Sequence, residues 1–208
     1  MKFKIPFSGR SHIFLKNEIK LVSKLMSSTV NLTQGSYQIK FENDFKNFLK
    51  NKNSRCFAVS SATSAIEIVS KLCNFNKNDE IIIPSHTYTS SAYPFLKTKA
   101  SIKWVDIDFK TRVVSLSNIK KKITKKTKAV MVVHLYGYAA NVNEIRDFCK
   151  HKKILLIEDV AQAIGTKIRN KMTGTFGDFS IFSFHSHKNM TTLGEGGMLV
   201  VNNSNYKN

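Results

Sequence analysis

Short apolar runs alternate with amphipathic stretches from Cys56 onward, a pattern typical of strand–helix units. We expect seven strands, at residues 56–60, 80–84, 101–105, 129–134, 154–158, 179–184 and 198–202. Strands that alternate with helices in this way form a largely parallel sheet. The pattern therefore predicts an α/β fold.

Two of the segments between these strands have the periodicity of helices. Apolar residues recur at steps of three and four between Ala65 and Cys73, and again within residues 141–152. Residues 1–50 are polar and helical in pattern, with no strand, and we interpret them as an N-terminal helical arm. Residues 51–208 are then the large domain.

The charge balance is strongly basic, with 33 Lys and Arg against 14 Asp and Glu and a formal net charge of +19. Such a surplus can indicate a protein that binds nucleic acid or a membrane surface. Here it is spread along the chain, and only the lysines between Lys120 and Lys128 are dense. We interpret that stretch as the polar face and end of a helix before the strand at Ala129. We expect a solvated basic surface, with no nucleic-acid or membrane partner, that is compatible with anionic substrates such as nucleotide sugars.

Three cysteines lie at wide, unpatterned spacings, which predicts buried thiols in a reducing compartment (Cys56, Cys73, Cys149). The N-terminus lacks the apolar run of about 7–15 residues that a secretory signal needs. No window reaches the roughly 20 apolar residues of a transmembrane helix. We expect a soluble, cytoplasmic protein.

Polar clusters follow five of the expected strands, at residues 61–64, 85–88, 134–136, 159–162 and 185–188. In an open α/β sheet, ligands bind beyond the carboxyl ends of the strands. The convergence of these clusters predicts one binding site at that edge.

Lys188 and Asp159 are the candidate catalytic residues. Lys188 lies in a loop that leaves an aromatic strand and enters a glycine-rich segment. It is either a surface charge or an amine that forms a Schiff base, for which partial burial and nearby cations lower the pKa. Glu158 and Asp159 are adjacent, so a strand projects them to opposite faces and one points inward. A carboxylate there either caps a helix or keeps a pyridine nitrogen protonated.

Other side chains of these clusters have both ordinary and functional interpretations. Residues 60–64 precede a helix and either cap it or cradle a phosphate, and Ser183 is a second hydroxyl within reach of the same phosphate. Tyr88 is a core or rim tyrosine, or it stacks on an aromatic cofactor. Gln162 is uninformative alone.

The remaining unusual residues do not indicate a metal or dinucleotide site. His185 and His187 have no third ligand at metal spacing, so we expect a substrate-facing or structural role and no metal. The glycines of residues 194–197 permit a tight turn but do not form a dinucleotide fingerprint.

An ordered set of motifs spans nearly the whole chain: TQG (33–35), VSSATSA (59–65), IIIPSHTYTSSA (81–92), HLYGYAANV (134–142), IEDVAQAIGT (157–166) and TFGDFSIFSFHSHKNMTTLGEGGM (175–198). This set resembles the DegT-like nucleotide-sugar aminotransferases, which depend on pyridoxal 5′-phosphate (PLP) and have fold type I. The resemblance implies the large domain of that fold, a mixed, mostly parallel seven-stranded sheet flanked by helices.

The resemblance also implies roles for individual residues. Lys188 would bind the cofactor covalently, Asp159 would pair with its pyridinium nitrogen, and Gln162 would contact its phenolic oxygen. The phosphate and the ring face would be held by four further residues (Ala62, Thr63 and Ser183 for the phosphate, Tyr88 for the ring). The related PLP sugar dehydratases have histidine at the lysine position, but alignment on Ser183 places Lys188 there.

Family members transfer an amino group, usually from glutamate, to a nucleotide-linked ketosugar for surface polysaccharides such as lipopolysaccharide or for deoxyaminosugars, and they act as homodimers. The chain departs from the family in two respects. Ala62 stands where the family usually has glycine, and family members are close to twice as long. We therefore expect the C-terminal small domain to be missing. The alternative to an active aminotransferase is an inactive or incomplete fragment that needs a missing C-terminal part or a full-length partner.

Overall fold

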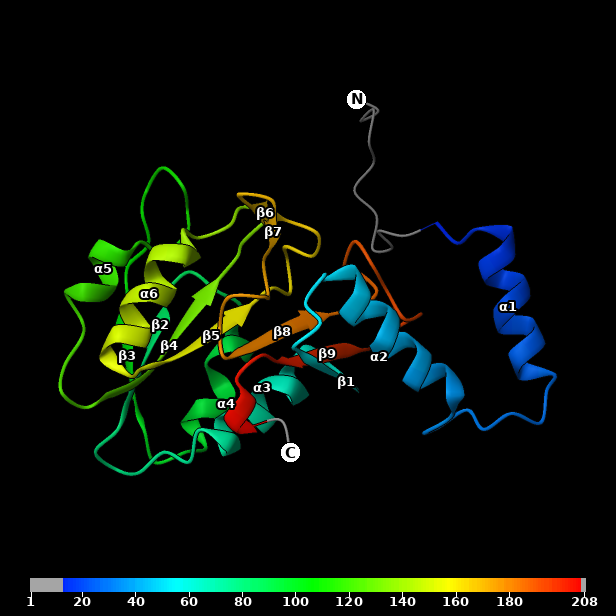
Figure 1. The fold of residues 1–208 in the computed structure, drawn as a ribbon, viewed down its shortest axis with the longest axis horizontal. Helices are drawn as coiled ribbons and strands as arrows, with labels where there is room; N and C mark the ends of the chain where they lie inside the picture. Colours follow the sequence, from blue (N-terminus) through cyan, green and yellow to red (C-terminus); the bar gives the residue numbers. More distant parts are fainter. Residues whose placement is uncertain (1–12, 207–208) are drawn as a thin grey trace.

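A seven-stranded mixed sheet forms the centre of the protein, as seen in a computed structural model that describes residues 13–206 (Figure 1). The strand order is β1-β9-β8-β5-β4-β2-β3. The strands are β1 (Arg55–Val59), β2 (Glu80–Pro84), β3 (Ser101–Val105), β4 (Thr127–Val133), β5 (Leu155–Asp159), β8 (Phe179–Ser183) and β9 (Gly197–Val201). Strands β3, β2, β4, β5 and β8 are parallel, and β9 runs antiparallel to both β8 and β1. The expected α/β fold and all seven strands are confirmed, two of them with the expected bounds and the others with ends displaced by at most two residues.

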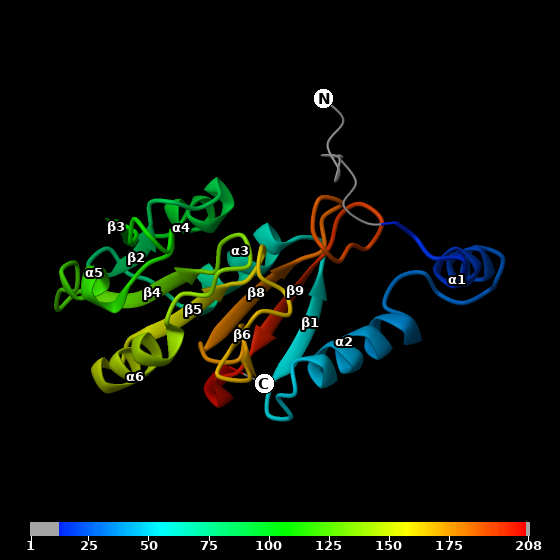
Figure 2. The ribbon, with the colours of Figure 1, turned by 90° about the horizontal axis from the view of Figure 1, so that it is seen from above.

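Helices cover both faces of this sheet. Helix α3 (Ala62–Leu72) and the short α4 (Tyr93–Leu96) lie on one face, while α2 (Ser36–Phe48), α5 (Leu116–Lys120) and α6 (Val142–Lys152) lie on the other (Figures 1 and 2). The two helices expected from periodicity are confirmed as α3 and α6. Each turns an apolar stripe to the sheet, and Ile66 and Val69 of α3 and Ile145 of α6 are almost fully buried.

The N-terminal segment contains two helices with different surroundings. Phe45 of α2 packs edge-to-face on Phe182 and Phe184 of the sheet, with ring centroids 4.9 and 5.6 Å apart. Helix α1 (Lys16–Met26) buries none of its residues and lies away from the sheet (Figure 1). The division into an arm over residues 1–50 and a domain over 51–208 stays a prediction, and residues 1–12 lie outside the described part of the chain.

The lysine-rich stretch differs from the expectation of a helix. Helix α5 ends at Lys120, and Lys128 already belongs to β4. Threonine hydroxyls form a turn here: Thr124 Oγ1 accepts a hydrogen bond from the N–H of Lys126 (3.0 Å), and Thr127 Oγ1 accepts one from the N–H of Thr124 (3.0 Å). Side-chain hydroxyls that bond nearby amides compete with the helix, which explains its early end.

Three smaller elements complete the structure: a hairpin of β6 (Lys167–Ile168) and β7 (Lys171–Met172) and two short 3₁₀ turns, η1 (Thr89–Ser91) and η2 (Ser204–Tyr206). All three cysteines are buried and free, as expected. In residues 13–206, no helix combines the length and the apolar character that crossing a membrane demands.

Candidate functional site

A cavity of about 440 Å³ opens at the carboxyl ends of β5 and β8, beside the N-terminus of α3. Residues from five separate segments of the chain contribute its lining. The seven residues predicted from the sequence all lie on it (Ala62, Thr63, Tyr88, Asp159, Gln162, Ser183, Lys188). The predicted convergence on one edge of the sheet is present for four of the five polar clusters, whereas residues 134–136 do not line the cavity and His134 is buried beside Glu158.

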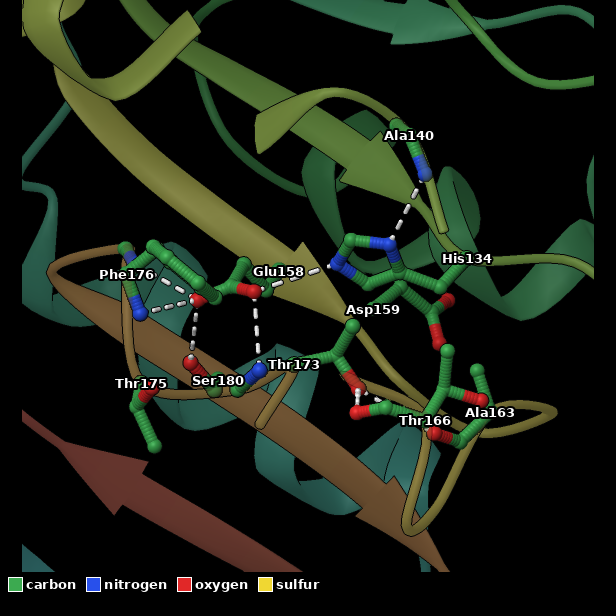
Figure 3. Close-up of polar contacts among 12 residues, drawn as sticks. His134, Ala140, Glu158, Asp159, Ala163, Thr166, Thr173, Thr175, Phe176 and Ser180 are labelled. Carbon is green, nitrogen blue, oxygen red and sulfur yellow. Dashed lines mark hydrogen bonds and ion pairs between the residues drawn. The ribbon is translucent and has the colours of Figure 1, made fainter. Parts of the chain in front are cut away.

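Strand β5 ends in two carboxylates that point to opposite faces of the sheet (Figure 3). Asp159 lines the cavity and is 6% exposed. Its Oδ1 accepts a hydrogen bond from the N–H of Ala161 (3.0 Å), and its Oδ2 accepts one from the hydroxyl of Ser91 (2.7 Å). These two donors fix the orientation of the carboxylate at the cavity wall.

Glu158 is fully buried on the opposite face, where it holds a loop in place. Its Oε1 accepts from the N–H groups of Phe176 (2.7 Å) and Gly177 (2.6 Å), and its Oε2 accepts from the N–H of Gly174 (2.8 Å). Nε2 of His134 lies 3.1 Å from Oε2 (Figure 3). Since Nδ1 of His134 accepts a hydrogen bond from the N–H of Ala140, Nε2 carries the ring hydrogen and donates a hydrogen bond to Oε2 of Glu158.

The pKa of Glu158 reflects opposing influences. Burial raises the pKa of this carboxyl, but the hydrogen bond from His134, together with those from the amides of Gly177 and Gly174, lowers it further than burial raises it. The net pKa is below the ordinary value for glutamate. Glu158 is therefore an ionised structural group beneath the cavity.

The start of α3 provides a cradle for an anion. Ser61 is its N-cap, and Ser61 Oγ accepts from the N–H of Ser64 (3.1 Å). The capping interpretation is correct for Ser61, and it is compatible with an anion cradle, because the first N–H groups of a helix have no partner within the helix. The N–H groups of Ala62 and Thr63 belong to this set, and both residues line the cavity.

Ser183 lies next to this cradle because of the strand register. It pairs with Gly197 of β9, which on its other side pairs with Val59, just before Ser61. A Cβ on Gly197 would lie 2.5 Å from the carbonyl carbon of Ser61 and 2.7 Å from the nitrogen of Ala62. The missing side chain thus lets the start of α3 approach the sheet and brings the Ser183 hydroxyl to the same cavity.

The loop that carries Lys188 is linked internally. The backbone N–H of Lys188 donates to the carbonyl of His185 (2.8 Å), and Nε2 of His185 lies 3.3 Å from Oε1 of Glu195. The N–H of His187 donates to Nδ1 of His185 (3.2 Å). All four side chains line the cavity. Among residues 13–206, no group of three or more His, Cys, Asp and Glu side chains could hold a metal ion.

Gln162 is oriented by the loop after β4. Its side-chain Oε1 accepts from the N–H of Tyr136 (3.3 Å), and its carbonyl accepts from the N–H of Gly137 (2.9 Å). This contact leaves the Nε2 hydrogens as the donors of the side chain. Tyr88 is 70% exposed at the rim, where it lines the cavity before η1.

Two hydroxyls at this site were not singled out from the sequence: Thr87 falls within the predicted polar cluster 85–88, and Ser91 lies outside it. Ser91 is buried against Asp159, and Thr87 Oγ1 lies 2.6 Å from Ser91 Oγ. Both lie in the segment TYTSSA, where alternating hydroxyl residues after a strand were the available signal. The local sequence gives no reason to choose among them.

The side chains present fit PLP. A buried carboxylate, a lysine amine and a helix N-terminus with nearby hydroxyls match its ring nitrogen, its aldehyde and its phosphate. The cavity volume also lies within the range of about 300–1,000 Å³ that is usual for small-molecule sites.

Comparison with known proteins gives consistent results. Residues 13–208 match the model of the DegT/DnrJ/EryC1/StrS aminotransferase family. The chain is 40% identical over 186 residues to a GDP-perosamine synthase of Vibrio cholerae, an alignment that covers 89% of this chain and 50% of that protein. It is also 36% identical over 141 residues to a UDP-N-acetyl-3-dehydro-alpha-D-glucosamine 3-aminotransferase of Acidithiobacillus ferrooxidans, covering 68% of this chain and 38% of that protein.

Solved structures have the same fold. An aminotransferase from Psychrobacter cryohalolentis superposes with a TM-score of 0.87 at 30% identity, covering 96% of this chain and 50% of that one. A GDP-4-keto-6-deoxymannose-3-dehydratase with a trapped PLP-glutamate geminal diamine superposes with a TM-score of 0.85 at 26% identity, covering 96% and 52%. The chain spans about half the length of the relatives it matches. The family match covers more than nine-tenths of the sequence, and on this evidence the chain belongs to the DegT/DnrJ/EryC1/StrS aminotransferase family, whose members depend on PLP.

Proposed function

We propose that this chain is the cofactor-binding part of an aminotransferase that acts on a nucleotide-linked ketosugar. The observation that carries the proposal is the meeting of Lys188, Asp159 and the N-terminus of α3 on one cavity. When bound there, PLP supplies an electron sink for the carbon that bears the amino group.

Each residue then has a defined task. The Asp159 carboxylate holds a proton on the ring nitrogen, and the Lys188 amine binds the cofactor and moves a proton at the reacting carbon. The Nε2 hydrogens of Gln162 donate to the phenolic oxygen. The amides of Ala62 and Thr63 bind the phosphate, together with a hydroxyl named above (Ser183), and the exposed aromatic side chain at the rim covers the ring face (Tyr88).

The substrate class follows from the relatives. A GDP-perosamine synthase and a UDP-sugar 3-aminotransferase support a nucleotide-linked sugar substrate. The glutamate adduct in a structural neighbour supports glutamate as amino donor. The pathway we propose is surface polysaccharide or deoxyaminosugar biosynthesis.

We further propose a homodimer in the cytoplasm. Helix α1 exposes Ile19, Leu21 and Met26 and buries no residue, and apolar surface of this kind supports association with a second chain. Three free thiols support a reducing compartment.

Two alternatives to an active aminotransferase remain as outcomes of the test. Several structural neighbours are sugar 3-dehydratases, and His187 lines the cavity beside Lys188. Because the chain spans half the length of its relatives, an incomplete fragment that needs a further part or a full-length partner is the other alternative.

The test begins with cofactor binding. The purified chain is mixed with PLP, its visible absorbance is recorded, and borohydride is added before peptide mapping by mass spectrometry. We expect PLP to be fixed on Lys188, and Lys188→Ala to lose both the absorbance and the adduct. Lys167→Ala, an exposed lysine of β6 outside the cavity, is the matched control and should behave like wild type.

Turnover separates the remaining activities. With glutamate and GDP- or UDP-linked ketosugars, an aminotransferase forms 2-oxoglutarate and an aminosugar, whereas a dehydratase forms a deoxysugar without nitrogen. A wild-type chain that takes up no PLP would contradict the proposal, and an adduct on a residue other than Lys188 would refute the assignment of the lysine.

A further inference from the structure

We propose that Thr87 and Ser91 are positioning residues that hold the Asp159 carboxylate fixed toward the cofactor through a chain of hydroxyl hydrogen bonds. This inference rests on the proposed function, since its effect is exerted on PLP through Asp159.

The geometry gives the chain of hydrogen bonds a direction. Ser91 is 1% exposed, and its hydroxyl donates to Oδ2 of Asp159 over 2.7 Å. A serine hydroxyl has a single hydrogen, so Ser91 has none left for Thr87. The 2.6 Å contact between Thr87 Oγ1 and Ser91 Oγ therefore has Thr87 as its donor. Both hydrogens point toward Asp159.

Such an arrangement strengthens the contact at the carboxylate. A hydroxyl that accepts a hydrogen bond becomes a better donor, and this polarisation is stronger in a buried environment. Ser91 and Asp159 are both buried, and the carboxylate is negative, so its hydrogen bond is of the charge-assisted type. The N–H of Ala161 fixes the other oxygen, which leaves no freedom for the carboxylate to rotate away.

The fold maintains this contact over a long sequence separation. Ser91 lies 68 residues before Asp159 and ends the turn η1, in which its N–H donates to the carbonyl of Tyr88 (2.9 Å). The same turn carries Tyr88 at the rim of the cavity. Residues 87–91 thus join the expected ring-covering side chain to the hydroxyls that hold the carboxylate.

The experiment measures PLP affinity by titration of the visible absorbance. We expect Ser91→Ala to weaken PLP binding about tenfold, the size of one lost charge-assisted hydrogen bond. Thr87→Val, which keeps the shape of the side chain and removes its hydroxyl, should weaken PLP binding about threefold, since Thr87 acts on Asp159 only through Ser91. Thr87→Ser keeps the hydroxyl and should restore the wild-type affinity. Thr89→Ala, in the same turn but outside the cavity lining, is the matched control.

A double-mutant cycle tests whether Ser91 acts through Asp159. In an Asp159→Asn background the carboxylate charge is gone, so Ser91→Ala should change PLP affinity by less than about twofold. An unfolding titration without PLP identifies any variant that fails to fold. If Ser91→Ala is such a variant, the difference in PLP affinity between Thr87→Val and Thr87→Ser tests the inference in its place.

Each outcome has a separate meaning. A wild-type chain that binds PLP together with a Ser91→Ala variant of equal affinity would overturn this inference and leave the proposed function intact. An unchanged tenfold effect in the Asp159→Asn background would also overturn it, because Ser91 would then act by another route. Failure of the wild type to bind PLP would overturn the proposed function and this inference with it.

Discussion

Replacing Gly197 with alanine should push the start of α3 away from the sheet. The added Cβ would lie 2.5 Å from the carbonyl carbon of Ser61, 2.7 Å from the nitrogen of Ala62 and 2.8 Å from the oxygen of Ser61. Ordinary contacts of a Cβ begin at 3.4 Å, so the backbone must move by roughly 1 Å. Backbone atoms between a strand and a helix cannot rotate aside as a flexible side chain does.

The cost affects both stability and binding. Overpacking of this kind costs about 1–3 kcal/mol, and for a chain of this size each kcal/mol lowers Tm by about 2–4 °C. The displaced atom is the Ala62 nitrogen, which we propose as a phosphate ligand. Since a hydrogen bond to a charged group is worth about 1.5–3 kcal/mol, losing the one from this amide should lower PLP affinity at least tenfold.

Thermal unfolding and PLP titration measure the two effects in one variant. Gly194→Ala is the matched control, because a Cβ there meets nothing within 4 Å and the residue lies in the same glycine-rich segment. A Gly197→Ala protein with wild-type PLP affinity would refute the assignment of the α3 N-terminus as the phosphate cradle. A Tm within about 1 °C of wild type would refute the packing argument as well.

Two further predictions concern buried ionisable groups. Glu158→Gln should cost about 3 kcal/mol or more in urea unfolding, since an amide cannot replace the buried charge and turns hydrogens toward amide donors. Because the pKa of Glu158 is lowered in the folded state, its contribution to stability is present above about pH 4.5 and is lost as pH falls further. The unfolding free energy of Glu158→Gln should therefore fall less steeply with decreasing pH than that of the wild type. Equal acid slopes in the two proteins would contradict the argument. Burial raises the pKa of Cys73 to about 12, so this thiol should react with a disulfide reagent at pH 8 only after unfolding. Its contribution to stability should be present below about pH 9 and decrease as pH rises toward 12, which unfolding measurements across that range check.

The sheet was predictable because its strands are short and its central strands are mostly buried, although the edge strands β1 and β3 are largely exposed or half-buried. The residues of β2 are all buried, and so are those of β8 and β9, so each appears in the sequence as an apolar run. The hairpin of β6 and β7 was not predicted, because two-residue strands carry no periodicity. Its turn is formed by Arg169 and Asn170, both with positive φ, and only the asparagine gives a local signal of this.

The site was predictable to the extent that its residues follow strands directly. Asp159 and Ser183 end β5 and β8, and parallel strands bring such ends together. Ser91 could not be selected from its neighbours, because its role depends on a contact with a residue 68 positions away. The wrong expectation of a helix through Lys128 has a similar cause: lysine is compatible with helix, turn and strand, and the threonine hydroxyls decide among them.

The two carboxylates of β5 show how the fold separates a structural acid from a chemical one. In the described part of the chain, Glu158 accepts from five donors, three of them backbone amides. A carboxylate has about four lone-pair sites, so this group has no capacity left for a ligand. The Asp159 side chain accepts from two donors and faces a cavity. Its remaining acceptor capacity is therefore directed to whatever the cavity binds, and under the proposed function a protonated ring nitrogen would be the donor that occupies it.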